Sequence, residues 1–256
     1  MNIEICEVGP RDGLQSEKRI WSVAERVELI NKLTQAGVKR IEAASFVNPK
    51  RVPQMANAEA VMAAIDHPSH VRVAGLALNM RGIERALDAG VDEVRYVVVA
   101  SETFNMKNQG ASIDETLKGL EEIAKRVIES GRLLSGTIGA SFGCPFEGNT
   151  STDVVVEIAR RYEQVGVHEV MLADTIGCAV PSQVRNLISV VRAELSETIG
   201  LGCHFHNTRN TGIANAVAAV EAGAQILDSS IGGIGGCPFA PRATGNISTE
   251  DLCYVL

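Results

Sequence analysis

The stretch Gln164-Val165-Gly166-Val167-His168-Glu169-Val170-Met171 places a glycine between a helical pattern and a short, largely apolar run. The same joint recurs around Gly37, Gly90 and Gly223. A glycine just past a helix adopts the left-handed backbone that ends the helix, so each joint predicts a helix followed at once by a strand. The recurrence indicates a chain built from repeated strand-and-helix units.

The segments on either side of these joints support this interpretation. Apolar residues stand at helical spacing in four segments, namely Val23, Val27, Ile30 and Leu33; Met55, Ala58, Met62 and Ile65; Ile113, Leu117, Leu120, Ala124 and Val127; and Val184, Leu187, Ile188 and Val191. Ser22 with Glu25, and Ser112 with Glu115, fit capping boxes at helix starts. Short apolar runs lie at 71–78, 94–100, 170–173 and 226–227. Such runs are typical of parallel strands covered on both faces.

Eight strands are predicted, beginning near residues 3, 38, 71, 94, 134, 168, 201 and 225. Strict alternation of eight strands with helices favours a closed (β/α)₈ TIM barrel, and an open doubly wound sheet is the alternative. We expect one catalytic domain over residues 1–256, because such barrels take about 250 residues. The eighth helix is predicted to start at Ser248-Thr249-Glu250-Asp251, so that the chain ends within it.

Composition excludes several classes of function. The formal net charge of −7 argues against non-specific nucleic-acid binding, which needs a basic face. The chain contains no run of 18 apolar residues, so no membrane span is predicted. The N-terminus lacks the pattern of a signal peptide. Six scattered cysteines without a C-x-x-C pair fit a reducing compartment, so we expect a cytoplasmic protein.

Polar residues stand where the predicted strands end, which is where barrel enzymes place their catalytic groups. They are Arg11, Asp12, Glu42, Ser45, Asp174, Thr175, His204, His206 and Asn207. His204 and His206 are two residues apart on a strand, so both imidazoles project to the same face. With Asp12 they predict a metal site that suits Mn²⁺, Fe²⁺ or Zn²⁺, while a further oxygen ligand would admit Mg²⁺. A buried polar network without an ion is the alternative.

Four further residues are candidates for catalysis. Arg11 stands beside the ligand-like aspartate, which favours an oxyanion stabiliser over a surface cation. Glu42 and Asp174 are candidate catalytic carboxylates, or else carboxylates satisfied by packing. Cys237 follows the glycine-rich run 232–236, where a thiol could protonate a carbanion, although an incidental cysteine fits equally well. The glycines suit a hinge for a lid.

Several motifs resemble the 3-hydroxy-3-methylglutaryl-CoA lyase family from end to end of the chain. They are Glu7-Val8-Gly9-Pro10-Arg11-Asp12-Gly13-Leu14-Gln15, Ser45-Phe46-Val47-Asn48-Pro49-Lys50, Gly143-Cys144-Pro145-Phe146-Glu147-Gly148, Asp174-Thr175-Ile176-Gly177 and Gly232-Gly233-Ile234-Gly235-Gly236-Cys237-Pro238-Phe239-Ala240. The segment around Cys237 is specific to the lyases. The Arg-Asp and His-x-His elements also occur in related isopropylmalate and homocitrate synthases.

This resemblance implies a set of roles. The residues that match the family's ligands for Mg²⁺ or Mn²⁺ are Asp12, His204, His206 and Asn246. Arg11 matches the arginine that steadies the enolate of acetyl-CoA, and Cys237 matches the loop cysteine that acts as acid or base on that product. Glu42 and Asp174 match acidic residues tied to catalysis.

The implied reaction is a retro-Claisen cleavage of an acyl-CoA that carries a tertiary 3-hydroxyl, with 3-hydroxy-3-methylglutaryl-CoA giving acetyl-CoA and acetoacetate. His204, or Asp174 through a water, would take the hydroxyl proton. Lys18, and less directly Lys50 and Arg51, could meet the CoA phosphates, while plain solvated charge is the alternative. Many barrels dimerise, so a homodimer is the assembly we consider, although no apolar stripe identifies an interface.

The chain departs from the family's pattern at four places, namely Asn207-Thr208-Arg209-Asn210-Thr211, Pro241-Arg242, Ala77-Leu78-Asn79 and Gln109-Gly110. We expect these to cluster at the barrel mouth and to leave the acyl substrate open. A lyase for a related substrate such as citramalyl-CoA is therefore one alternative. A synthase that condenses acetyl-CoA with a 2-oxo acid is a second, and a non-catalytic metal-binding barrel is a third.

Overall fold

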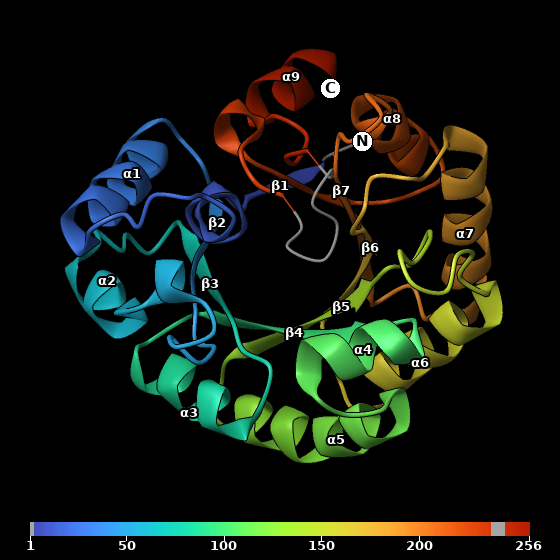
Figure 1. The fold of residues 1–256 in the computed structure, drawn as a ribbon, viewed down its shortest axis with the longest axis horizontal. Helices are drawn as coiled ribbons and strands as arrows, with labels where there is room; N and C mark the ends of the chain where they lie inside the picture. The colour runs from blue at the N-terminus through green and yellow to red at the C-terminus, as the bar shows by residue number, and fades with distance from the viewer. Residues whose placement is uncertain (1–2, 237–243) are drawn as a thin grey trace.

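A computed structural model of the protein describes residues 3–236 and 244–256. Eight parallel strands close into a barrel in chain order, with β8 pairing to β1, and helices surround it (Figure 1). The strands are β1 (Glu4–Glu7), β2 (Arg40–Ser45), β3 (Arg72–Leu76), β4 (Glu93–Val99), β5 (Leu133–Gly139), β6 (Glu169–Asp174), β7 (Gly200–Phe205) and β8 (Ile226–Ser229). The helices are α1 (Val23–Gln35), α2 (Ala58–Ala64), α3 (Met80–Asp88), α4 (Glu102–Gln109), α5 (Ile113–Glu129), α6 (Thr152–Gln164), α7 (Pro181–Glu194), α8 (Gly212–Glu221) and α9 (Thr249–Val255). The predicted (β/α)₈ barrel is confirmed.

The local signals act as the sequence predicts. The joint glycines Gly37, Gly90, Gly166 and Gly223 have φ angles of 99°, 79°, 88° and 102°, a region in which residues with a Cβ are strained. Both predicted capping boxes form, at the starts of α1 and α5. Each joint therefore ends a helix and turns the chain into the next strand.

The structure differs from the sequence-based expectation in three places. Helix α4 was not predicted, and it stands between β4 and α5, capped by Ser101 and ended by Gly110. Met55 lies in a separate short turn, because Asn57 adopts a left-handed backbone (φ 58°) just before α2. Glu42 was expected just past the second strand but lies inside β2. Its side chain lines a cavity in the barrel interior.

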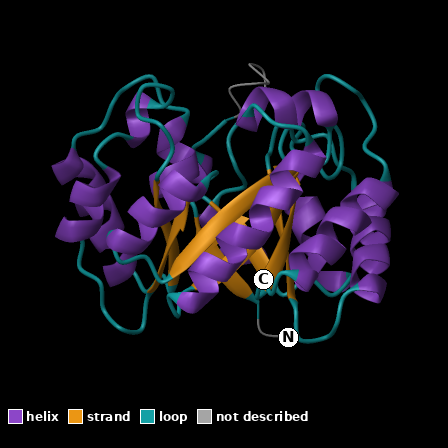
Figure 2. Ribbon diagram, turned by 90° about the horizontal axis from the view of Figure 1, so that it is seen from below, coloured by secondary structure: helices purple, strands orange, loops and turns teal. Residues whose placement is uncertain are grey.

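Helices pack around the outside of the strands (Figure 2), and the main apolar core draws its buried residues from both. The barrel interior instead carries charge in two layers. Arg40, Glu93 and Glu169 begin their strands and are buried at the amino end of the barrel. Arg95 and Asp228 lie nearer the carboxyl end and are also buried.

Two further expectations concern features of the whole chain. The five cysteines among the described residues are all free. In the part of the chain that the structure describes, no helix has the length and apolar character needed to cross a membrane.

Candidate metal centre and active site

A short π-helical turn at Gly9–Gly13 carries Arg11 and Asp12 over the carboxyl end of the barrel. The backbone N–H groups of residues 11, 12 and 13 all donate to the carbonyl of Val8, at 3.1, 2.7 and 3.3 Å. The buried carboxylate of Glu7 accepts from the N–H of Gly9 at 2.7 Å. A Cβ at Gly9 would lie 2.6 Å from that carboxylate oxygen, so glycine is required for the turn to sit this close.

Asp12, His204 and His206 converge at this end of the barrel. Their candidate ligand atoms all lie within 4.8 Å of one another. His204 is the fifth residue of β7 and His206 follows the strand, and their ring centroids are 5.1 Å apart. The prediction that both imidazoles project to one face beside Asp12 is therefore confirmed.

Hydrogen bonds fix which nitrogen of each imidazole faces the centre. His204 Nδ1 lies 3.2 Å from Asp228 Oδ2, and His206 Nδ1 lies 3.2 Å from the carbonyl oxygen of Thr244. Both partners accept hydrogen bonds at neutral pH, so Nδ1 of each ring carries the proton. The lone pair of each Nε2 is left for a metal, which is how ligating histidines are commonly held.

Asn246 supplies a fourth donor atom. Its Nδ2 donates to Asp12 Oδ2 at 2.9 Å and to the carbonyl oxygen of Ile234 at 3.1 Å. Its Oδ1 is buried and has no hydrogen-bond partner among the described residues. A buried amide oxygen without a donor is costly, and a cation would satisfy it. Two imidazoles, one carboxylate and one amide oxygen form a donor set that fits a divalent metal ion.

Electrostatics keep this donor set ready for a cation. Burial raises the pKa of Asp12, but the charges of Arg11, His204 and His206 outweigh burial and lower the pKa below its usual value. Burial and the neighbouring charge of His204 lower the pKa of His206 to about 4. Burial lowers the pKa of His204, but the hydrogen bond and charge of Asp228 together with Asp12 outweigh it and raise that pKa. Asp12 is thus ionised and His206 neutral at neutral pH.

Arg11 lies directly beside this cluster. Its Nη1 donates to Asp12 Oδ1 at 2.6 Å and its Nη2 donates to Glu42 Oε2 at 2.7 Å. Its Nε is buried and has no hydrogen-bond partner within the described residues, and the same holds for Glu42 Oε1. The guanidinium is held in place by two carboxylates and retains a free donor.

One cavity of about 150 Å³ is shared by Arg11, Glu42, Asp12 and the two histidines. Its polar lining consists of Arg11, Asp12, Gln15, Glu42, Arg95, Asn108, Thr137, Thr175, His204, His206 and Asp228. Its apolar lining includes Leu76, Val97, Val99, Phe104 and Ala173. A metal-ligand set, an arginine and an apolar wall therefore meet at the carboxyl ends of the strands.

Two predicted site residues lie outside the cavity, and a third falls outside the described residues. Asp174 ends β6 but does not line the cavity, and its two oxygens accept from the N–H groups of Cys178 and Ala179 at 2.9 and 3.0 Å. Burial raises the pKa of Asp174. Lys18 is exposed and outside the cavity lining. Cys237, like the departure at Pro241-Arg242, lies outside the described residues.

Two asparagines in the segments that contain departures from the family pattern bind backbone at the starts of helices. Asn207 Oδ1 accepts from the N–H of Gly212 at 3.1 Å, at the start of α8. Asn79 Oδ1 accepts from the N–H of Gly82 at 3.0 Å and caps α3. Neither asparagine lines the cavity.

Sequence reasoning missed Asp228 and Arg95. Asp228 follows an apolar pair near the end of β8, so the strand-end rule that found Asp174 would also have found it. Arg95 stands in the middle of β4, inside the apolar run 94–100. A charged residue within a run that is buried on both faces is the signal that could have identified it.

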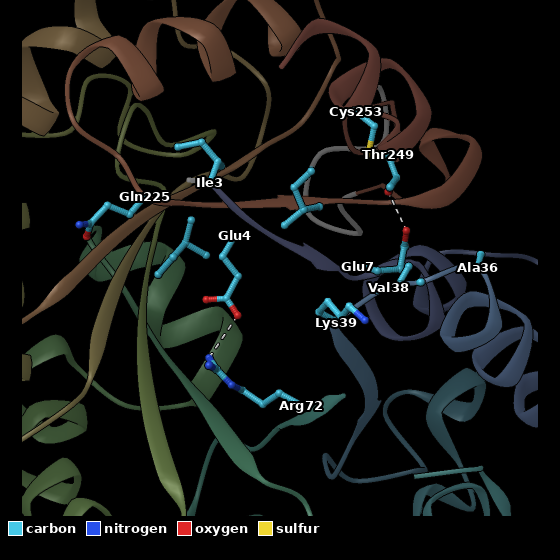
Figure 3. Close-up of a pocket in the computed structure, with 13 residues that line it drawn as sticks. Ile3, Glu4, Glu7, Ala36, Val38, Lys39, Arg72, Gln225, Thr249 and Cys253 are labelled. Atoms are coloured by element: carbon cyan, nitrogen blue, oxygen red, sulfur yellow. Dashed lines mark hydrogen bonds and ion pairs between the residues drawn. The ribbon is translucent and has the colours of Figure 1, made fainter. Parts of the chain in front are cut away.

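A second cavity, of about 740 Å³, lies at the amino-end side of the barrel and is lined by residues of β1, α9 and the joint before β2 (Figure 3). An ion pair joins Glu4 to Arg72 at 3.4 Å, and Thr249 Oγ1 donates to Glu7 Oε2 at 2.6 Å. Its lining includes no histidine and neither candidate metal cluster. This cavity is therefore not the candidate catalytic site.

The fold and the site together define a class of protein. It is a (β/α)₈ barrel with a candidate divalent-metal site of two histidines and one carboxylate at the carboxyl ends of its strands, and an arginine beside these residues. A family model described as HMGL-like matches residues 2–256, and the chain belongs to this family.

Similarity to curated relatives extends over nearly the whole chain. The chain is 41% identical to the mitochondrial hydroxymethylglutaryl-CoA lyase of Bos taurus over 99% of its own length and 78% of that protein. It is 43% identical to the (R)-citramalyl-CoA lyase of Chloroflexus aurantiacus over 99% of its length and 83% of that protein. Among solved structures, an HMG-CoA lyase from A. baumannii in complex with coenzyme A and 3-methylmalate is 40% identical. It superposes with a TM-score of 0.94 and covers 99% of this chain and 83% of that one.

Proposed function

We propose that this protein is a metal-dependent carbon–carbon lyase that cleaves 3-hydroxy-3-methylglutaryl-CoA to acetyl-CoA and acetoacetate, with one catalytic barrel domain over residues 1–256. The observation that carries the proposal is the meeting of Asp12, His204 and His206 with Arg11 in a single cavity. Asn246 joins this group through its hydrogen bond to Asp12. The similarity to hydroxymethylglutaryl-CoA lyases over nearly the full chain supports the choice of substrate.

The ligand set proposed for Mg²⁺ or Mn²⁺ is Asp12, His204, His206 and Asn246. The bound ion would supply a Lewis acid that lowers the pKa of the substrate's tertiary hydroxyl. Arg11 pairs with the outer oxygen of Asp12, so it orients that carboxylate toward the centre. Asp228 and the carbonyl of Thr244 orient the two imidazoles.

The reaction requires a base for the hydroxyl proton. Glu42 Oε1 is buried in the cavity wall without a partner among the described residues, which supports Glu42 as this base. The predicted alternatives are less well supported, because Asp174 already accepts two backbone hydrogen bonds and His204 Nε2 is proposed as a ligand. When the hydroxyl loses its proton, the new ketone forms and the bond between C2 and C3 breaks. The electron pair then passes to the thioester carbonyl as an enolate.

The enolate oxygen needs donors already in place. Arg11 Nε is buried and unpartnered within the described part of the chain, so it can donate to that oxygen without breaking an existing hydrogen bond. A proton must then reach the enolate carbon to give acetyl-CoA. Cys237 remains the residue proposed for this step on the resemblance alone.

The second candidate is cleavage of citramalyl-CoA, because the chain is 43% identical to an (R)-citramalyl-CoA lyase. In both substrates the tertiary hydroxyl stands on C3, one of the two carbons of the bond that breaks. The same residues could therefore catalyse either cleavage. Lys18 as a contact for the CoA phosphates, a homodimer and a cytoplasmic location stay predictions.

The test is release of acetyl-CoA from each substrate, with Mg²⁺, with Mn²⁺ and with EDTA. We expect metal-dependent release from 3-hydroxy-3-methylglutaryl-CoA that is lost in His206→Ala. Release only from citramalyl-CoA would keep the chemistry and change the substrate. Release from neither, while acetyl-CoA and a 2-oxo acid yield free CoA, would contradict the lyase and favour the synthase.

A further inference from the structure

Arg95 is a buried arginine whose partners connect it to the metal ligands. It stands in β4 with 2% of its surface exposed. Its Nη1 and Nη2 donate to Asp228 Oδ2 and Oδ1 at 2.8 and 3.0 Å. This bidentate geometry fixes the carboxylate plane as well as its position.

The carboxylate of Asp228 also contacts the imidazole of His204. Its Oδ2 lies 3.2 Å from His204 Nδ1, and Asp228 pairs with His204 across β7 and β8. The same oxygen therefore receives Arg95 Nη1 on one side and the imidazole on the other. Fixing Asp228 fixes both the ring plane and the tautomer of His204.

Arg95 also lies near two other buried carboxylates, each of which has a closer arginine partner. Its Nη1 lies 3.8 Å from Glu42 Oε2, and its Nε lies 3.4 Å from Glu93 Oε1. Without this guanidinium, Asp228 would remain buried. Among the described residues, its carboxylate would then keep one hydrogen-bond partner, the imidazole of His204. An unpaired buried charge is strongly unfavourable, so Asp228 would move away from this position. The imidazole of His204 would then lose the partner that orients it.

We propose that Arg95 is a positioning residue for the metal centre, which holds Asp228 so that His204 presents Nε2 to the cation. The inference rests on the proposed metal site but not on the identity of the acyl-CoA. Arg95 need not touch substrate to act in this way. Its effect passes through one carboxylate to one ligand.

The sign of the effect separates positioning from simple charge. Arg95 is a cation near a cation site, so Coulomb repulsion alone predicts that its removal tightens metal binding. Loss of a residue that orients a ligating histidine predicts weaker binding, typically by about 10–100-fold. Mn²⁺ affinity in the absence of substrate therefore distinguishes the two roles.

The experiment is a titration of the full chain with Mn²⁺, read by the electron paramagnetic resonance signal of free Mn²⁺. We expect the dissociation constant to rise about 10–100-fold in Arg95→Met, with part of the affinity restored in Arg95→Lys. Lysine keeps the charge but cannot form two parallel hydrogen bonds, so its rescue is incomplete. Arg95→Met with unchanged or tighter Mn²⁺ binding would overturn the proposal.

A matched control and a coupling test make the result specific. Arg40 is also a fully buried arginine of the barrel interior, and Arg40→Met should lose stability while Mn²⁺ affinity stays within about twofold. Adding Arg95→Met to Asp228→Ala should weaken Mn²⁺ binding no further, because the effect passes through Asp228. Fully additive effects on the Mn²⁺ dissociation constant would contradict a route through Asp228.

Wild-type protein that binds no Mn²⁺ would overturn both the metal site and this inference. Mn²⁺ binding without cleavage of either acyl-CoA would contradict the proposed function but leave this inference standing.

Discussion

The two ends of the barrel interior carry the same types of residue in different arrangements. At the amino end Glu93, His168 and Glu169 bring candidate ligand atoms within 4.8 Å of one another, as Asp12, His204 and His206 do at the carboxyl end. At the amino end Arg40 stands among the carboxylates, with Nη1 2.9 Å from Glu169 Oε2 and Nη2 2.5 Å from Glu93 Oε1.

This difference decides what each cluster can do. The guanidinium of Arg40 already supplies the positive charge that a metal ion would bring, and it occupies oxygens of both carboxylates. At the carboxyl end the arginines lie outside the cluster, since Arg11 binds the outer oxygen of Asp12 and Arg95 binds Asp228. Residue types alone therefore do not define a metal site, because the position of the counter-cation also matters.

The largest expected effect comes from removing one histidine at each end. His206→Ala should lower kcat/KM for acetyl-CoA release about a thousandfold or more, because a Lewis acid contributes several kcal/mol to the barrier. His168→Ala should leave kcat/KM within a few-fold of wild type. Initial rates at saturating Mg²⁺ measure both. Equal losses in the two variants would remove the distinction between the ends.

The next effect separates the arginines. Arg11→Met should lower kcat about 10²–10³-fold, as expected when a donor to a developing oxyanion is lost. Arg40→Met should leave kcat nearly unchanged but lower the free energy of unfolding by about 3–5 kcal/mol, since Glu93 and Glu169 lose their buried partner. Urea unfolding and steady-state kinetics on both variants provide the check. A stable Arg40→Met protein with low kcat would contradict the assignment.

A smaller effect compares the two carboxylates at opposite ends of β6. Burial raises the pKa of Glu169, but the charge of Arg40 and the nearby imidazole of His168 outweigh burial, so the pKa is lowered well below its usual value. Its contribution to stability is present above the unfolded value of 4.5 and is lost as the pH falls toward the folded value. Burial raises the pKa of Asp174 above 3.8, so its contribution becomes more favourable as the pH falls through the folded value.

Urea unfolding of wild type, Glu169→Gln and Asp174→Asn between pH 7 and pH 3 measures this contrast. The stability difference between wild type and Glu169→Gln should shrink on acidification. The difference between wild type and Asp174→Asn should shift in the opposite direction. Parallel pH profiles for the two variants would show that the two ends of the strand do not differ in this way.

The smallest effect concerns His168. Burial lowers its pKa, but the carboxylate of Glu169, 3.3 Å from His168 Nε2, outweighs burial and raises the pKa above 6.5. The stability that this pair contributes is present below pH 6.5 and is lost as the pH rises through the folded value. His168→Gln should therefore cost more stability at pH 5.5 than at pH 8.5, by about 1 kcal/mol or less. Thermal unfolding at both pH values tests this, and a larger cost at pH 8.5 would be inconsistent with the raised pKa.

The sequence was sufficient to predict the barrel because its signals are local. Glycine joints such as Gly166, capping boxes such as Ser22 with Glu25, and the spacing of apolar residues each depend on a few neighbouring positions. Helix α4 escaped prediction because it carries no clear apolar stripe; its buried residues are Phe104 and Asn105. The ends of parallel strands meet in space, which is why Asp12, His204 and His206 could be grouped without a structure.

The surrounding residues could not be predicted in the same way. That Asp228 accepts from His204 and Arg95 depends on register across three strands. That Asp174 turns its oxygens to the N–H groups of Cys178 and Ala179 depends on the path of the loop after β6. Strand-end position identifies which residues can reach the mouth of a barrel, but the hydrogen bonds decide which of them face the cavity.

Electron spin echo envelope modulation counts the histidine nitrogens bound to Mn²⁺ and so tests the location of the metal centre. Two imidazole nitrogens are expected in wild type and in His168→Ala, and one in His206→Ala. A wild-type complex without imidazole coupling, or a coupling lost in His168→Ala and kept in His206→Ala, would contradict the assignment of the metal centre to the carboxyl end of the barrel.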